Sequence, residues 1–214
     1  MSIIIPALIA KSQHSISMVQ GLKLRDGSLV FKSVECRGAR CLTSYRGAVA
    51  IFASKAYSSD TEQHYEWFGA YSEQADKRKA VKLDGEQASY YRAWSVYTSA
   101  WSYRLVGFVR LTGVVKSADL TIGGAKMRAL HKRATDFRGA WIYPDPPATY
   151  LEVEPLHELT AADGPKFSEI CYGCTVAKPP HNPTACHVNW QTVCMQSDQI
   201  PAHVKKEIAP WQPK

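Results

Sequence analysis

Three ionisable side chains, Lys32, Glu35 and Arg37, fall within six residues and adjoin a predicted apolar strand. Charges beside a buried strand cost free energy unless they face a cleft and find partners, so this segment is a candidate site. A cationic Lys32 could bind phosphate or polarise a carbonyl, whereas a neutral Lys32 could attack as a nucleophile. Glu35 could act as a general base for water. Lys32 and Glu35 are therefore candidate catalytic residues.

The spacing of these residues limits how they can meet. In a strand over 33–37, Val34 and Cys36 point inward, and Glu35 and Arg37 point outward. Lys32 and Glu35 share one side only if Lys32 lies on the loop before the strand or a bulge intervenes, because their spacing is odd. The alternative is a structural pair of Glu35 and Arg37, with Lys32 in solvent.

A second candidate site lies near the C-terminus, where four of the six cysteines crowd together. The Cys171-x2-Cys174 pair can bind a metal from one turn, and zinc favours four thiolate or imidazole ligands. A segment with so few core residues also needs a covalent or metal staple. The predicted structural zinc site has four first-choice ligands, Cys171, Cys174, Cys186 and Cys194. His187 or His181 could substitute for one of them, and two disulfides or unmetallated thiols are the alternatives.

Positive charge is concentrated in the first two-thirds of the chain. Residues 1–138 hold 21 Lys/Arg against 11 Asp/Glu, a balance of +10, whereas residues 139–214 hold 5 against 8, a balance of −3. Such a field attracts polyanions, although a solvated basic surface is the simpler interpretation. The predicted nucleic-acid contacts besides Arg37 are Lys55, Lys126, Arg128, Lys132 and Arg133. Lys55 follows Ser54, and these two could border the Lys32 cleft or form a surface strand end.

The elements that position these residues follow from hydrophobic patterning. Strands are predicted over 33–37, 48–53, 105–115 and 149–156, and Gly107 indicates a bulge or close approach within the third. Asp26-Gly27 indicates a hairpin, and the basic segment 121–138 a helix or ordered loop. The strands are separated by a long helical region, which favours an α+β fold or a barrel with helices.

The region 56–104 is polar, aromatic-rich and helical in its spacing. Tyr90, Trp94, Tyr97 and Trp101 recur at intervals of four, three and four residues, as in an amphipathic helix. Such rings could stack unpaired bases, but aromatic residues at this spacing more often pack in a core. We expect mainly core packing.

Composition limits the class of protein. The chain has 214 residues, of which 45% are hydrophobic and 21% charged, as in globular soluble domains. It holds no apolar run long enough to cross a bilayer. The apolar N-terminus, IIIPALIA, lacks the features of a signal peptide and is expected to form an edge strand or core-filling arm. These features predict a cytoplasmic protein with reduced cysteines and no membrane partner.

The segments KSVECR, YRGAVAIFASK and LVGFVRLTGVVKSADL resemble the ASCH domain family of the PUA-like superfamily, in the family's order. Lys32, Glu35 and Arg37 fit the Lys-x-x-Glu-x-Arg part of its signature, whereas Val30 replaces the signature's Gly. ATDFRGAWIYPDPPATYLEVEPLHEL resembles the closing segment. The resemblance spans about residues 12–160. It implies a small twisted β-barrel with flanking helices over 1–164, with a helical insertion at about 56–104. The change in composition from about residue 165 predicts a Cys-rich extension over 165–214.

The resemblance also implies function. Related domains bind RNA or modified bases, so one hypothesis is an RNA or modified-nucleoside binding protein with a cleft lined by Lys32, Glu35 and Arg37. Some family members are hydrolases of N4-acetylcytidine, in which the motif Lys is catalytic, and others are reported to be ribonucleases. In those amidohydrolases Thr stands where this chain has Glu35. An enzyme of either kind is thus the second hypothesis, and a protein-interaction module using the basic face and tail is the third.

Overall fold

The structure is a computed structural model of the whole chain. It describes residues 2–23, 29–37, 45–54, 97, 99–135, 149–160, 164–166 and 191–208. Within these residues, no helix is long and apolar enough to cross a membrane.

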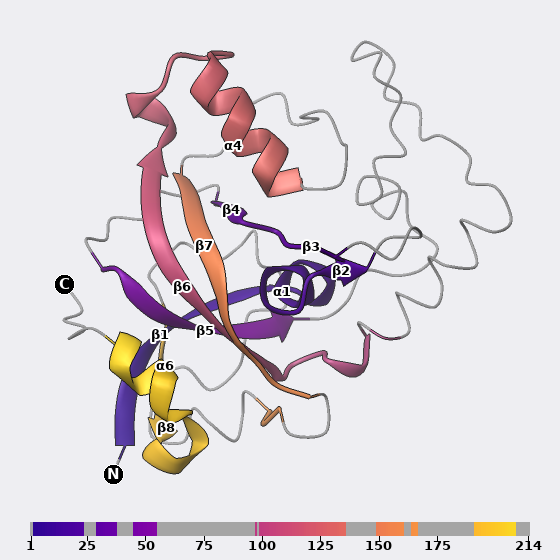
Figure 1. Cartoon of the computed structure of the whole chain (residues 1–214), viewed down its shortest axis with the longest axis vertical. Helices are drawn as coiled ribbons and strands as arrows, with labels where there is room; N and C mark the ends of the chain where they lie inside the picture. Colours follow the sequence, from indigo (N-terminus) through magenta and orange to yellow (C-terminus); the bar gives the residue numbers. More distant parts are fainter. Residues whose placement is uncertain are drawn as a thin grey trace, which may run out of the picture.

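The central element is a mixed sheet in the order β4-β7-β6-β5-β1-β8, which curls into a half-barrel (Figure 1). Its first three strands in sheet order are β4 (Val34–Arg37), β7 (Thr149–Glu158) and β6 (Leu105–Lys116). They pair antiparallel, as does β5 (Gly47–Ser54) with β6. The four strands predicted from hydrophobic patterning are therefore confirmed within a few residues.

The N-terminal strand, β1 (Ser2–Lys11), lies inside the sheet. It pairs parallel with β5 on one side and antiparallel with β8 (Gln191–Gln196) on the other. The expectation of an edge strand is wrong, because β8, from the predicted C-terminal extension, covers the free side of β1. A separate hairpin joins β2 (Leu22–Lys23) to β3 (Leu29–Val30), as the Asp-Gly turn signal predicted.

Helix α1 (Ser12–Val19) follows β1 directly and packs inside the curl of the sheet. Ile16, Met18 and Val19 bury their side chains there against β5, β6 and β7. Its serine hydroxyls bond to backbone carbonyls, with Ser12 donating to Ser54 at 2.7 Å. These bonds allow a helix with buried polar residues to lie against the sheet, since each hydroxyl has an acceptor.

Two further helices cover other parts of the sheet. Helix α4 (Ala125–Thr135) follows β6 and the short turn η1 (Ser117–Asp119), and it packs over β4 and β7. Helix α6 (Ala202–Glu207) follows β8 and the turn η3 (Ser197–Gln199). Val204 of α6 joins the core on the sheet face opposite α1. The helices and the sheet together form the α+β arrangement expected from the sequence.

Gly107 marks an irregularity in the sheet. Its φ is +153°, and pairing shifts register next to it on both neighbouring strands. A Cβ atom at this position would collide with the carbonyl oxygen of His157 and would lie 2.7 Å from Val19. The predicted close approach is therefore confirmed, and it lets β7 and α1 pack tightly against β6.

Candidate functional site

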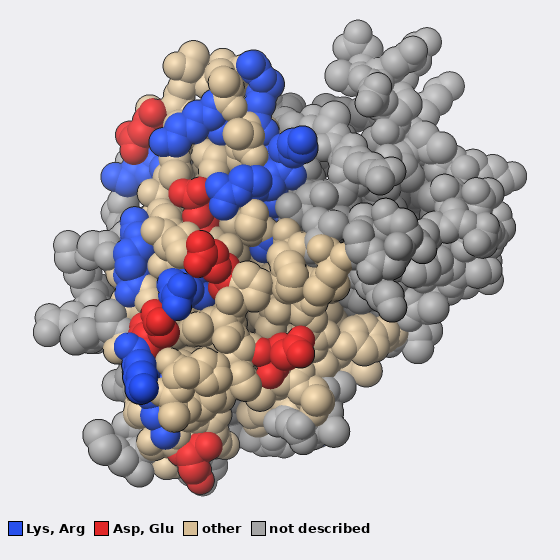
Figure 2. Space-filling view, viewed as in Figure 1, with Lys and Arg blue, Asp and Glu red and all other residues tan. Residues whose placement is uncertain are grey.

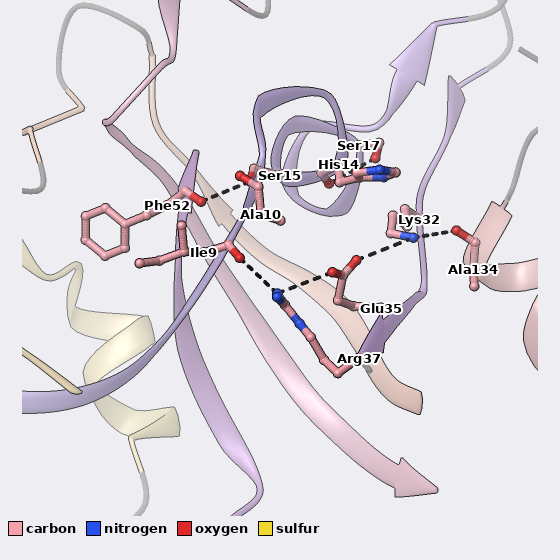
Figure 3. A network of polar contacts seen from close by, with 10 residues as sticks. All are labelled: Ile9, Ala10, His14, Ser15, Ser17, Lys32, Glu35, Arg37, Phe52 and Ala134. Atoms are coloured by element: carbon pink, nitrogen blue, oxygen red, sulfur yellow. Dashed lines mark hydrogen bonds and ion pairs between the residues drawn. The ribbon is translucent and has the colours of Figure 1, made fainter. Parts of the chain in front are cut away.

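Lys32 lies on the short segment just before β4. Its backbone N–H donates to the carbonyl oxygen of Ser17 at 2.9 Å, which ties this segment to the end of α1. The residue is 4% exposed, and its Nζ lies 3.5 Å from Oε2 of Glu35. The same Nζ donates to the carbonyl oxygen of Ala134, near the end of α4 (Figure 3). Lys32 meets Glu35 because it precedes the strand, which is one of the two arrangements that their odd spacing allowed.

Glu35 and Arg37 are two residues apart on β4 and therefore share one face. Oε1 of Glu35 lies 3.3 Å from Nη2 of Arg37, which donates to the carbonyl oxygen of Ile9 at 3.0 Å. Figure 3 shows the carboxylate between the Lys32 ammonium and the Arg37 guanidinium. We call Lys32, Glu35 and Arg37 the charged cluster.

The charged cluster is buried, with exposures of 7% for Glu35 and 8% for Arg37. The prediction that this face of β4 points outward is wrong, because the curled sheet turns it toward α1 and β1. The alternative in which Lys32 is solvated is also wrong. Val34 and the half-buried Cys36 face the core beneath α4, so β4 is covered on both sides.

The electrostatics of the cluster keep the carboxylate ionised. Burial by itself raises the pKa of Glu35, but the charges of Arg37, Lys32 and His14 outweigh it and leave that pKa below its usual value. With Lys32 and Arg37 as cations, the cluster carries one net positive charge inside the protein. A buried excess of positive charge favours an anionic ligand.

Two buried polar atoms near this region retain hydrogen-bonding capacity. Within the described residues, Nε of Arg37 and Oγ of Ser54 have no hydrogen-bond partner. Ser54 is fully buried at the end of β5, so its interpretation as a surface strand end is wrong. Lys55, predicted to accompany it, lies outside the described residues. An unpaired buried guanidinium N–H is costly, which makes Arg37 the cluster member with a donor to offer a ligand.

The geometry bears on the two chemistries proposed for Lys32. A nucleophilic lysine must be neutral, whereas this side chain donates to a carboxylate and a carbonyl at once, which suits the ammonium form. The contacts therefore favour a binding or charge-stabilising role over covalent catalysis. A catalytic role for Lys32 and Glu35, and a cleft beside them, stay predictions from the sequence.

The predicted nucleic-acid contacts on 121–138 all lie on α4, and Lys126, Arg128, Lys132 and Arg133 are exposed. Figure 2 shows Lys and Arg side chains gathered over this end of the molecule. Arg133 also fastens the helix, because it donates to Glu152 at 2.5 Å and to Oγ of Ser33 at 3.1 Å. Gly113 leaves room for this contact, since a Cβ atom there would collide with the Glu152 carboxylate.

The inner face of α4 holds a contact that the sequence did not reveal. His131 is 9% exposed, and its Nε2 shares a hydrogen bond with the hydroxyl of the fully buried Tyr150 on β7. Burial lowers the pKa of His131 and raises that of Tyr150. His131 falls within the basic segment 121–138, but the helical period of Met127, Leu130 and Ala134 indicates that it lies on the buried face.

The predicted zinc ligands cannot be assembled from the described residues. Cys171, Cys174 and Cys186 lie outside them, as do His181 and His187, while Cys194 belongs to β8 and pairs with Ile4. The described part of the chain contains no group of three or more His, Cys, Asp or Glu residues that could hold a metal ion. The zinc site stays a prediction.

The two members of the aromatic stripe that the structure describes divide between core and surface. Trp101 is 1% exposed and belongs to the core, as expected. Tyr97 is 44% exposed, and its hydroxyl donates to Gln20 at 2.7 Å. Tyr90 and Trp94 lie outside the described residues, together with most of the predicted insertion.

Comparison with known proteins adds no assignment. No protein-family model matches the chain, and no curated protein is significantly similar to it. Any functional hypothesis therefore depends on the residues and their geometry.

Proposed function

We propose that the protein binds nucleic acid, with RNA or a modified nucleoside as the ligand. The exposed face of α4 contacts phosphates, and the charged cluster contacts the base or nucleoside. The observation that carries the proposal is the direct link between these two parts. Nζ of Lys32, inside the cluster, donates to Ala134 of the basic helix. In this proposal the curled sheet is a PUA-like barrel, as the ASCH resemblance implies.

The basic residues of α4 form two rows along its exposed face. Arg128 and Lys132 are four residues apart and lie on one side, and Lys126 and Arg133 are seven apart on the other. Phosphates repeat along a nucleic-acid backbone, so cations arranged in rows suit it better than a single cation does. The placement of the cations on α4 thus supports the proposal as well as their number does.

Salt dependence of binding tests the phosphate contacts. Fluorescence anisotropy with a labelled single-stranded RNA should show affinity falling as salt rises. A plot of the logarithm of the binding constant against the logarithm of salt concentration should fall with a slope of about 0.7 for each phosphate contact. We expect the double variant Lys126→Ala/Lys132→Ala to lower this slope by about 1.4. The control is Lys205→Ala/Lys206→Ala on α6, which removes the same charge from a helix at the other end of the molecule (Figure 1).

The control variant should keep the wild-type slope. Equal losses in both variants would mean that only the net charge of the protein matters. Absence of RNA binding at low salt would reject the function and leave a protein partner as the candidate for the basic face.

A second variant tests the charged cluster. Arg37→Lys keeps the charge but loses the planar guanidinium and its Nε donor. If the cluster contacts a base, this variant should bind RNA more weakly with an unchanged salt slope, because no phosphate contact is lost. Circular dichroism checks that the variant remains folded. This role would be contradicted if Arg37→Lys bound RNA as tightly as the wild type but with an altered salt slope.

A further inference from the structure

Ile122 projects from the turn between η1 and α4. Ile122 is 82% exposed, more than any other large hydrophobic residue that the structure describes. Isolated exposed apolar residues are common, and exposure alone assigns no function to them. The surroundings of Ile122 decide what it can do.

The turn that carries Ile122 is closely held. The N–H of Gly124 donates to the carbonyl oxygen of Thr121 at 2.9 Å, and Gly123 has a φ of +67° that favours glycine. The guanidinium of Arg128 donates to the carbonyl oxygen of Gly123, and its backbone N–H to that of Gly124 at 3.0 Å. Ile122 is therefore presented on a turn fixed to α4, so that little conformational entropy is lost when it binds.

Along the chain, the turn lies between two exposed cations, of which Lys126 belongs to the proposed binding surface. Lys116 ends β6 just before η1 and is exposed, and Lys126 lies in the first turn of α4. Asp119 of η1 is the acidic residue on the same connection. A Cβ atom added at Gly123 would meet nothing within 4 Å, so the space beside Ile122 is open. An exposed apolar side chain near cations suits a nucleic acid, whose charged phosphates surround stacked, largely apolar bases.

We propose that Ile122 is a wedge that inserts between neighbouring bases of a nucleic acid held by α4. Apolar side chains beside Arg and Lys unstack base steps in this way. Unstacking costs least where pairing is already interrupted, so the preferred ligand is an RNA stem with a bulge or mismatch. A bilayer fits less well, because membrane-surface helices bury a whole apolar face, whereas the turn offers one apolar side chain. This inference rests on the proposed function.

Unstacking can be measured separately from binding. The probe is an RNA hairpin with a one-nucleotide bulge and 2-aminopurine beside it, whose fluorescence rises when the base unstacks. We expect the wild type to raise this fluorescence and to bind the bulged hairpin more tightly than a fully paired one. Ile122→Ala should lose the rise and bind the bulged hairpin about tenfold more weakly, with an unchanged salt slope. Ile122→Leu should retain both.

Leu29→Ala is the matched control, since Leu29 is also apolar and 54% exposed but lies in the β2–β3 hairpin. If Ile122→Ala keeps the fluorescence rise while salt-dependent RNA binding persists, the wedge is wrong and the proposed function stands. If the wild type binds no RNA, both fail. Ile122-dependent binding to phosphatidylserine vesicles without RNA binding would assign the turn to a membrane instead.

Discussion

The guanidinium of Arg37 donates to the carbonyl oxygen of Ile9 at 3.0 Å. This bond joins β4, at one end of the sheet order, to β1, which lies four strands away. The same guanidinium contacts Glu35, so one side chain links β4 to β1 and also helps to balance the buried carboxylate. The charged cluster is thus structural as well as a candidate binding site.

Removing the charge of Glu35 should destabilise the fold strongly. Glu35→Gln leaves two buried cations without their counter-ion, and we expect a loss of about 3–5 kcal/mol in the free energy of unfolding. Urea denaturation measures it. Glu154→Gln is the control, because its carboxylate is 58% exposed and lies 3.5 Å from Arg110. The control should lose less than about 1 kcal/mol in the free energy of unfolding. Equal losses in the two variants would show that the charged cluster contributes no more to stability than an exposed ion pair.

The ionisation of Glu35 should also appear in the pH dependence of stability. Its pKa is lowered in the folded state, so the unfolded chain binds a proton more readily. The contribution is therefore complete above the ordinary titration range of glutamate, about pH 4.3, and is lost as pH falls through the folded-state pKa. Urea unfolding between pH 6 and pH 2.5 should show a smaller pH slope for Glu35→Gln than for the wild type. Parallel curves would contradict this assignment.

Gly107 should tolerate no side chain. Gly107→Ala places a methyl group against a backbone carbonyl at a φ of +153°, and we expect a loss of about 3 kcal/mol or more. Gly123→Ala is matched, since its φ is also positive but the space around it is open. That variant should lose only about 1 kcal/mol, from backbone strain. Thermal and urea unfolding distinguish the two, and a mild Gly107→Ala would show that β7 can move away.

The hydroxyl of Tyr150 should help to hold α4 on the sheet. Tyr150→Phe removes its hydrogen bond to the buried His131, and we expect a loss of about 1–2 kcal/mol. Tyr97→Phe removes a similar bond from a half-exposed ring and should cost less, because water can replace the lost partner. Hydrogen exchange of α4 amides gives a local readout. If the α4 amides of Tyr150→Phe exchanged as slowly as those of the wild type, the hydroxyl would not be holding α4 on the sheet.

Local sequence patterns predicted most of the sheet. Alternating or continuous apolar residues identified β4, β5, β6 and β7, because burial on one or both faces requires them. The patterns were weaker for β1, which was expected to be an edge strand or a core-filling arm, and for β8, which was not predicted. Position in a sheet depends on pairing between distant segments, and no local pattern encodes it.

The candidate site divides in the same way. The types and spacing of Lys32, Glu35 and Arg37 were enough to single them out and to require either that Lys32 precede the strand or that a bulge intervene. Their burial was not predictable, because it arises from the curl that brings α1 and β1 over β4. Nor was the bond from Lys32 to Ala134, whose partners are 102 residues apart.

The sequence by itself determined which segments form strands, where charge is concentrated and which three residues could do chemistry. These properties depend on residue type and short-range periodicity. Only the tertiary structure decided that the three charges share one buried network, that a basic helix is bonded to it and that Ile122 is displayed on a fixed turn. Those relationships require segments far apart in the chain to meet, or a turn to be held by its neighbours in space.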